Sequence, residues 1–400
     1  MNSTLSNVTA VPTGLNTQPT VPAPVDRVPP EILDQIISLA LPPKIVIPNP
    51  LAPSPPRENR TYLDLAHVSH NFRVAMLNNS ANFTTLSLTM PRACHHHSDN
   101  DLSFLGFVLS CAGERPLSLT ITLVNANGYQ DATKNHRADG LCPCIGLILQ
   151  HHLQSLRLLA RECATIADFI VTRGLNRSIF TQSSLQNFEI CTRRAADGWS
   201  VVRFLDILAT RRFAGNLTIR IPAWIDYEAT SLKAVLPLIS SLQLSCCPHG
   251  LQHILPTFPS LQRLVLVHSA PSYPSTNTVS SQCITLNKLQ CLELHVNHFP
   301  DSGINTIIRS LQAPRLTTLS IEWAHESGSI TPGFVHALER VLSRSRTPIR
   351  HLTWIERRSG PYTALDNPSP LHPMLVQMLM RLGLNCTLTE WSVVSRANKR

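Results

Sequence analysis

The sequence has 400 residues, of which 43% are hydrophobic, and this is enough to bury a substantial core in one large domain or several smaller ones. The formal net charge is +9, but the densest basic stretch, residues 340–358, also contains glutamates and carries no nucleic-acid-binding signature, so a solvated basic face is favoured over a nucleic acid partner. No run of about 18 apolar residues could span a bilayer, and the first 25 residues lack a secretory signal. We therefore expect a cytoplasmic or nuclear protein with no membrane or nucleic acid partner, and its 11 cysteines to be reduced.

Residues 1–25 are rich in proline and are predicted to form a disordered tail. The stretch VPPEILDQIISLALPP that follows is predicted to contain a short helix with prolines at both ends. Pro30 fits the first turn, Glu31 favours the positive end of the helix dipole, and Pro42 ends the helix. Its apolar residues follow helical spacing: Ile32, Leu33, Ile36, Ile37 and Ala40.

A proline-rich loop over residues 44–59 separates this helix from a second one in TYLDLAHVSHNFRVAMLNN. There, Thr61 and Asp64 have the spacing of a capping box. The apolar stripe consists of Leu65, Val68, Phe72 and Met76. Two helices of this size give a small core, so we expect burial to be completed by a partner protein or by the rest of the chain.

The segments VPPEILDQIISLAL and LDLAHVSHNFRVAMLNNSANFTTLSL resemble the F-box motif, in the fungal form that has a long proline-rich loop between its first two helices. The family pattern opens with Leu-Pro-x-Glu-Ile-Leu, and here Val28 stands in place of the leucine. Phe72 and Phe83 stand where the family has tryptophans. The alternative is an ordinary pair of structural helices within residues 26–82.

The resemblance implies that residues 26–82 bind a Skp-family adaptor, and through it a cullin scaffold, in a ubiquitin ligase. Carried over by position, the adaptor-facing residues are Pro29, Glu31, Ile32, Leu33 and Ile36 in the first helix and Val68, Phe72 and Ala75 further on. For each apolar residue among them, an internal core contact is the alternative, because core and interface positions look alike in sequence.

A short motif recurs after residue 82: an apolar residue, two spacers, leucine, one spacer, leucine. Clear copies begin at residues 153, 185, 261, 289, 316 and 349. The last three steps are 28, 27 and 33 residues, and apolar helical faces lie between the copies. Residues 83–400 thus resemble an irregular leucine-rich-repeat solenoid of alternating helices and short parallel strands, which makes the expected fold α/β; a generic α/β domain is the alternative.

Strand residues alternate sides, so the residues between the buried leucines should face outward, on the side that forms the concave surface of a solenoid. This predicts a surface for an unidentified protein substrate made of Arg263, Glu293, His295, Thr318, Ser320 and Glu322.

No enzymatic motif is present, and we expect no cofactor. Neither Cys94-His95-His96-His97 nor the Cys142 and Cys144 pair has the usual spacing of a zinc site, so no metal is expected. We therefore expect a non-enzymatic substrate-recognition subunit of a Skp/cullin/F-box ubiquitin ligase. The alternatives are a scaffold or interaction protein with no link to ubiquitination, and, more remotely, an enzyme that uses a cysteine such as Cys191.

Overall fold

A computed structural model describes the greater part of the chain. The predicted tail at residues 1–25 lies outside the described residues. The described ranges are 28–47, 57–91, 99–124, 143–172, 185–193, 196–210, 212–221, 224–225, 236–245, 254–268, 283–296, 303–324, 332–347, 349–359, 373–382 and 388–396.

The chain builds one parallel sheet of twelve strands, whose order in the sheet follows their order in the sequence. The strands are β1 (Ile45–Ile47), β2 (Thr85–Pro91), β3 (Leu117–Val124), β4 (Leu153–Ala160), β5 (Asn187–Thr192), β7 (Asn216–Arg220), β9 (Ser241–Ser245), β10 (Arg263–His268), β12 (Cys291–Val296), β14 (Thr318–Ala324), β15 (His351–Ser359) and β16 (Leu388–Arg396). Two small parallel pairs accompany the sheet, β6 (Ala196–Asp197) with β8 (Trp224–Ile225) and β11 (Ile284–Thr285) with β13 (Leu311–Gln312). The predicted α/β class is confirmed.

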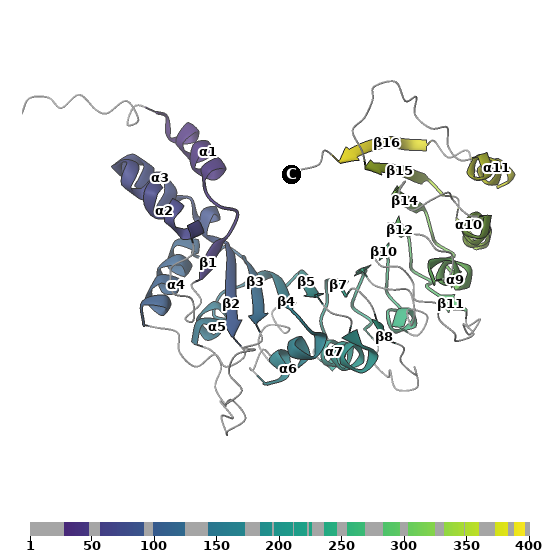
Figure 1. Ribbon diagram of the computed structural model, residues 1–400, viewed down its shortest axis with the longest axis horizontal. Coiled ribbons are helices and arrows are strands. Elements are labelled where there is room, and N and C mark those ends of the chain that lie inside the picture. The colour runs from purple at the N-terminus through teal and green to yellow at the C-terminus, as the bar shows by residue number, and fades with distance from the viewer. Residues whose placement is uncertain are drawn as a thin grey trace, which may run out of the picture.

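The sheet curves into an open arc, with the strands along its inner side and α4 to α11 along its outer side, while α1 to α3 continue the arc at its amino-terminal end (Figure 1). Among the described residues, no helix is long and apolar enough to cross a bilayer. The helices are α1 (Pro30–Ala40), α2 (Arg57–Val68), α3 (His70–Asn78), α4 (Asp99–Ala112), α5 (Pro143–Ile148), α6 (Cys163–Thr172), α7 (Gly198–Thr210), α9 (Gly303–Ser310), α10 (Pro332–Arg344) and α11 (Pro373–Arg381), with the 3₁₀ turns η2 (Ser80–Phe83) and η4 (Leu255–Thr257).

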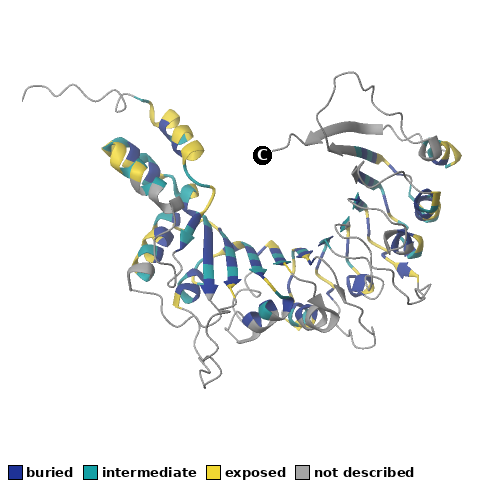
Figure 2. Ribbon diagram, in the orientation of Figure 1, coloured by how far each residue is buried: buried dark blue, intermediate teal, exposed yellow. Residues whose placement is uncertain are grey.

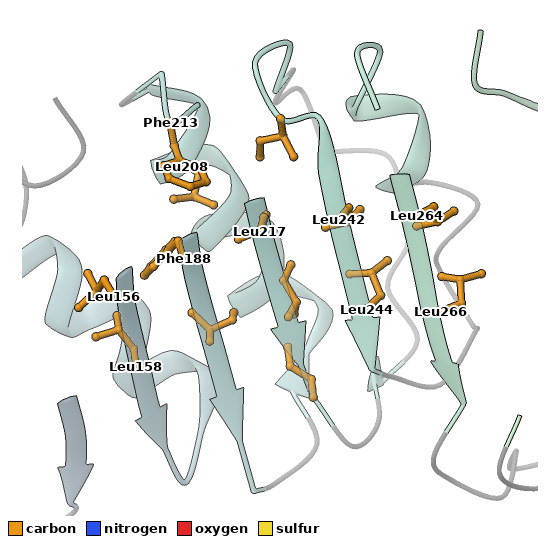
Figure 3. Close-up of a cluster of buried hydrophobic side chains, with 14 of the residues drawn as sticks. Leu156, Leu158, Phe188, Leu208, Phe213, Leu217, Leu242, Leu244, Leu264 and Leu266 are labelled. Carbon is orange, nitrogen blue, oxygen red and sulfur yellow. The ribbon is translucent and has the colours of Figure 1, made fainter. Parts of the chain in front are cut away.

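Apolar side chains at alternate positions of the strands, most of them leucines, form the core between the sheet and the outer helices (Figures 2 and 3). Parallel pairing places the leucines of neighbouring strands beside one another, as Leu242, Leu264 and Leu292 show. All three are fully buried. Backbone hydrogen bonds continue the pairing of neighbouring strands by one residue ahead of several strands. Before β12, for example, Gln290 N donates to Gln262 O at 2.8 Å. The recurring leucine motif in the sequence therefore forms the buried, helix-facing row of a continuous sheet.

A four-residue turn leads into several of these strands. It is closed by a bond from the fourth N–H to the first carbonyl oxygen, at 3.2 Å in Phe258–Leu261, 3.2 Å in Leu286–Leu289 and 3.1 Å in Ala313–Leu316. Pro259 and Pro314 occupy the second position, where a proline ring presets the required φ. The first and last side chains of each turn are buried and the central two point away from the core, so successive turns line up along the edge where the strands begin.

The amino-terminal helices differ from the prediction in two places. The predicted second helix is broken at Ser69, whose extended backbone (φ −160°, ψ 169°) and side-chain oxygen cap α3 by accepting from Phe72 N at 3.3 Å. Because α2 already begins at Arg57, Thr61 and Asp64 lie inside it and do not form the predicted capping box. The predicted loop at residues 44–59 also contains β1, which pairs with β2.

Aromatic side chains join these helices to the rest of the chain. Phe83 is 2% exposed and packs between the rings of Tyr62 and Phe107, with centroid separations of 6.2 and 6.5 Å. The Tyr62 hydroxyl donates to Asn82 O at 3.3 Å, and burial raises the pKa of Tyr62 to about 12. One continuous cluster of buried side chains therefore extends from Leu33 in α1 to α11.

Gly215 gives a direct test of the strand ladder. A Cβ added there would lie 2.6 Å from Gln186 O and 3.0 Å from the ring of Phe213. The Gln186 carbonyl cannot move away freely, because it also accepts from Asn216 N at 2.8 Å. We expect Gly215→Ala to lower the free energy of unfolding by about 1–3 kcal/mol, measured by urea denaturation.

The matched control is Gly106→Ala in α4, where an added Cβ meets nothing within 4 Å. Since alanine favours a helix interior over glycine, this variant should gain up to about 1 kcal/mol. Equal stability changes in the two variants would contradict the close approach at Gly215.

Candidate interaction surfaces

The first candidate surface is a row of exposed aliphatic side chains on α1. Ile32, Ile36 and Leu39 are 43%, 42% and 88% exposed, and their spacing places them along one face of the helix. Val68 at the end of α2 and Val74 on α3 are exposed as well, at 53% and 40%. We call the three exposed residues of α1, Ile32, Ile36 and Leu39, the apolar patch. A contiguous exposed apolar face on a helix indicates an interaction surface.

The opposite face of α1 is part of the protein's own core. Leu33 and Ile37 are buried and α1 packs on α3, where Phe72 and Met76 are buried as well. The helix is thus apolar on two sides, and only one of them is covered by the residues that the structure describes. That is why residues which look equivalent in sequence have different environments.

The partner-binding residues predicted from the sequence divide accordingly. Leu33 and Phe72, at 3% and 6% exposed, are core residues, so their assignment to a partner-facing surface is wrong. Of the remaining six, Pro29, Glu31, Ile32, Ile36 and Val68 are exposed and Ala75 is half-buried. Leu39 and Val74 were missed, although Leu39 follows Ile32 and Ile36 at helical spacing.

The second candidate surface is the inner side of the arc, which carries the polar residues that alternate with the buried leucines. Six of these were predicted to face outward. Arg263 is exposed, whereas Glu293, His295, Thr318 and Ser320 are half-buried and Glu322 is buried at 7%. Glu322 therefore lies beside His295 on the predicted side of the sheet, but it is buried there and not open to solvent.

Four of these side chains form two close charged pairs that lie side by side, which we call the Glu293 cluster. Arg263 Nε lies 2.8 Å from Glu293 Oε1, and His295 Nδ1 lies 2.9 Å from Glu322 Oε2. His295 Nε2 is 4.0 Å from the second oxygen of Glu293. The register that places His295 opposite Glu322 brings together residues from β10, β12 and β14.

The environment of this cluster shifts the pKa values of Glu293 and of the neighbouring Cys291. Burial of Glu293 opposes ionisation, but the hydrogen bond and the charge of Arg263 outweigh it, so the pKa of Glu293 is lowered. Burial, with Glu293 nearby, raises the pKa of the Cys291 thiol to about 11. Since the thiolate is the reactive form, Cys291 is a poor nucleophile at neutral pH.

A second charged group lies across β4, β5 and β7, and we call it the Glu189 cluster. Glu189 is held between Arg157 Nε at 3.3 Å and Arg220 Nε at 3.1 Å. The prediction missed it, although Arg157 and Glu189 occupy the same position of the leucine motif as Glu293. The inner side of the arc therefore presents two arginines around one glutamate at one place, and one arginine with two glutamates at another.

These clusters present charged groups that can pair with charged groups of a partner. Within the described residues, no group of three or more histidine, cysteine or acidic side chains is placed to hold a metal ion. Residues 94–97 and Cys142 lie outside the described residues, and Cys144 is buried. The absence of a metal and of a cofactor stays a prediction. No protein-family model matches the chain, and a comparison with curated proteins returned no match.

The Glu293 cluster predicts how stability depends on pH. Because its pKa is lowered in the folded state, Glu293 stabilises the fold fully above its unfolded pKa of about 4.3, and this contribution is lost as the pH falls through the folded pKa. We expect Arg263→Gln to lower the free energy of unfolding by less than about 1 kcal/mol at pH 7, since the arginine is 53% exposed. Urea denaturation at pH 7, 5, 4 and 3 should show the difference from the wild type vanishing at the acid end.

Arg350→Gln serves as the control, since Arg350 is exposed and its side chain has no acidic partner among the described residues. It should cost little at any pH. A difference for Arg263→Gln that stays constant down to pH 3 would contradict the ion pair with Glu293.

Proposed function

We propose that this protein is a substrate-recognition subunit of a Skp/cullin/F-box ubiquitin ligase. In this proposal, residues 26–82 form an F-box module that binds a Skp-family adaptor, and residues 83–400 form a leucine-rich-repeat-like solenoid whose inner side holds a protein substrate. The chain would position the substrate and would not itself transfer ubiquitin.

The observation that carries the proposal is the apolar patch on α1. The patch lies within the segment whose sequence resembles an F-box, and its residues Ile32 and Ile36 occupy the positions at which that resemblance implies contact with the adaptor. Covering the exposed parts of Ile32, Ile36 and Leu39 would contribute about 3 kcal/mol, at roughly 2 kcal/mol for each fully buried aliphatic side chain. That is worth about a hundredfold in affinity.

The architecture of the remaining chain supports the second half of the proposal. Each leucine strand is followed by a connection to the next parallel strand, without any change of order along the sheet. Stacks of this kind present an extended inner surface suited to a protein ligand. The Glu189 and Glu293 clusters give that surface charged groups of both signs, which favour one partner and its orientation over others.

The alternative is a scaffold whose inner surface binds a partner without any link to ubiquitination. Both proposals use the same inner surface, and they differ in what covers α1. The adaptor is therefore the ligand with which to separate them.

We expect the double variant Ile32→Asp with Ile36→Asp to bind a purified Skp-family adaptor at least about a hundredfold more weakly than the wild type. Docking would place two unpaired charges in an apolar interface, and each such charge costs several kcal/mol. Isothermal titration calorimetry with the full chain measures the affinity, and circular dichroism melting of the same sample checks the fold.

Leu238→Asp is the matched control, because Leu238 is 49% exposed and precedes β9, away from α1. It should bind the adaptor as the wild type does. Undiminished binding by the folded double variant, or no binding by the wild type, would remove the ubiquitin-ligase proposal and leave the scaffold.

A further inference from the structure

A pocket of about 450 Å³ opens at the edge of the sheet where the chain enters β12, β14 and β15. It is built from the turns that precede these three strands, on the green limb of the arc (Figure 1). Its lining is Asn287, Lys288, Pro314, Arg315, Arg346 and Thr347. The pocket is distinct from the apolar patch and from the inner side of the arc, since none of these residues belongs to a strand of the large sheet.

Among the described residues, the lining is strongly basic and contains no carboxylate. Lys288 Nζ donates to Ser260 Oγ at 3.3 Å, on the preceding turn. Arg315 and Arg346 are exposed, and neither side chain has a hydrogen bond or an ion pair among the described residues. Arg263 on the inner surface differs from these two arginines, because it is paired with Glu293. Three like charges around one hollow repel each other, and an anion between them removes that cost.

The repeat itself brings the cations together. Lys288 and Arg315 both occupy the third position of the closed turns Leu286–Leu289 and Ala313–Leu316, so they point away from the core at successive turns. Arg346 stands three residues before Ile349, at the place that a buried side chain takes in the other turns. It comes from the basic stretch 340–358, which the sequence alone identifies only as a solvated face.

Two carbonyl groups of the turns around the pocket, which would repel an anion, already accept hydrogen bonds. Pro314 O accepts from Arg346 N at 2.9 Å, and Leu316 O accepts from the Thr347 hydroxyl at 3.1 Å. The guanidinium groups of Arg315 and Arg346 keep their donors for a ligand. A guanidinium donates two parallel hydrogen bonds to a phosphate, whereas a lysine supplies a point charge.

We infer that this pocket binds a phosphate monoester, with Arg315 and Arg346 donating to the phosphate oxygens and Lys288 contributing charge. The volume exceeds the need of a bare phosphate and lies within the usual range for organic ligands. Pro314 and the aliphatic stems of the cations provide apolar contacts for the organic part. The ester is carried either by a small metabolite or by a phosphorylated side chain of a protein.

Isothermal titration calorimetry of the full chain tests this inference with three probes: inorganic phosphate, glycerol phosphate and the blocked tripeptide Gly-phosphoserine-Gly. We expect both esters to bind more tightly than inorganic phosphate. A tighter complex with glycerol phosphate assigns the site to a metabolite, and a tighter complex with the tripeptide assigns it to a phosphoprotein.

The double variant Arg315→Gln with Arg346→Gln should weaken ester binding by roughly tenfold or more, because charge-assisted hydrogen bonds are lost. Arg340→Gln removes one positive charge from the exposed side of α10 outside the pocket and should change affinity by less than about twofold. Should the double variant fail to fold, Arg315→Lys with Arg346→Lys keeps the charge, removes the paired donors and should still bind more weakly. The inference is overturned if neither ester binds the wild type, or if Arg340→Gln weakens binding as much as the double variant does.

Discussion

The burial of one leucine row per strand is the constraint on which the rest of the structure depends. Parallel strands in sequence order place Leu242, Leu264 and Leu292 side by side, and the outer helices cover them. Because side chains alternate along a strand, that burial fixes which residues face the inner side of the arc. The same register brings Glu293 to Arg263 and Glu189 to Arg157. The charged clusters are therefore consequences of the leucine ladder.

The amino-terminal helices belong to the same core and still leave a surface uncovered. Strand β1 extends the sheet, and Phe83 packs between α2 and α4, so the ladder supports the helices from one side. α1 then buries Leu33 and Ile37 against α3 and leaves Ile32 and Ile36 exposed. The row of exposed aliphatic side chains on α1 is of the kind that marks an interaction site, which favours a partner on the open side.

The sequence predicts the strands well and the surfaces only in part, for physical reasons. Spacing alone locates the leucine rows, since a buried strand face requires apolar residues at alternate positions. Leu33 was assigned to the surface by its position in the F-box resemblance, because neither that resemblance nor helical spacing says which apolar residues of α1 are internal. Alternation along the strand gives the side of the sheet on which Glu322 lies. It does not say that neighbouring side chains bury Glu322 there. Predicting the pocket around Arg315 and Arg346 requires knowing which turns lie next to each other, and only the fold shows this.

The central claim is that the open face of α1 and the inner side of the arc serve two different partners. Hydrogen–deuterium exchange of the full chain, with and without a purified Skp-family adaptor, tests it most directly. The account predicts slower exchange in α1 and α3 on adding the adaptor, and unchanged exchange in β10, β12 and β14. Protection of those strands with no change in α1 would contradict it, because the adaptor would then occupy the surface assigned to the substrate.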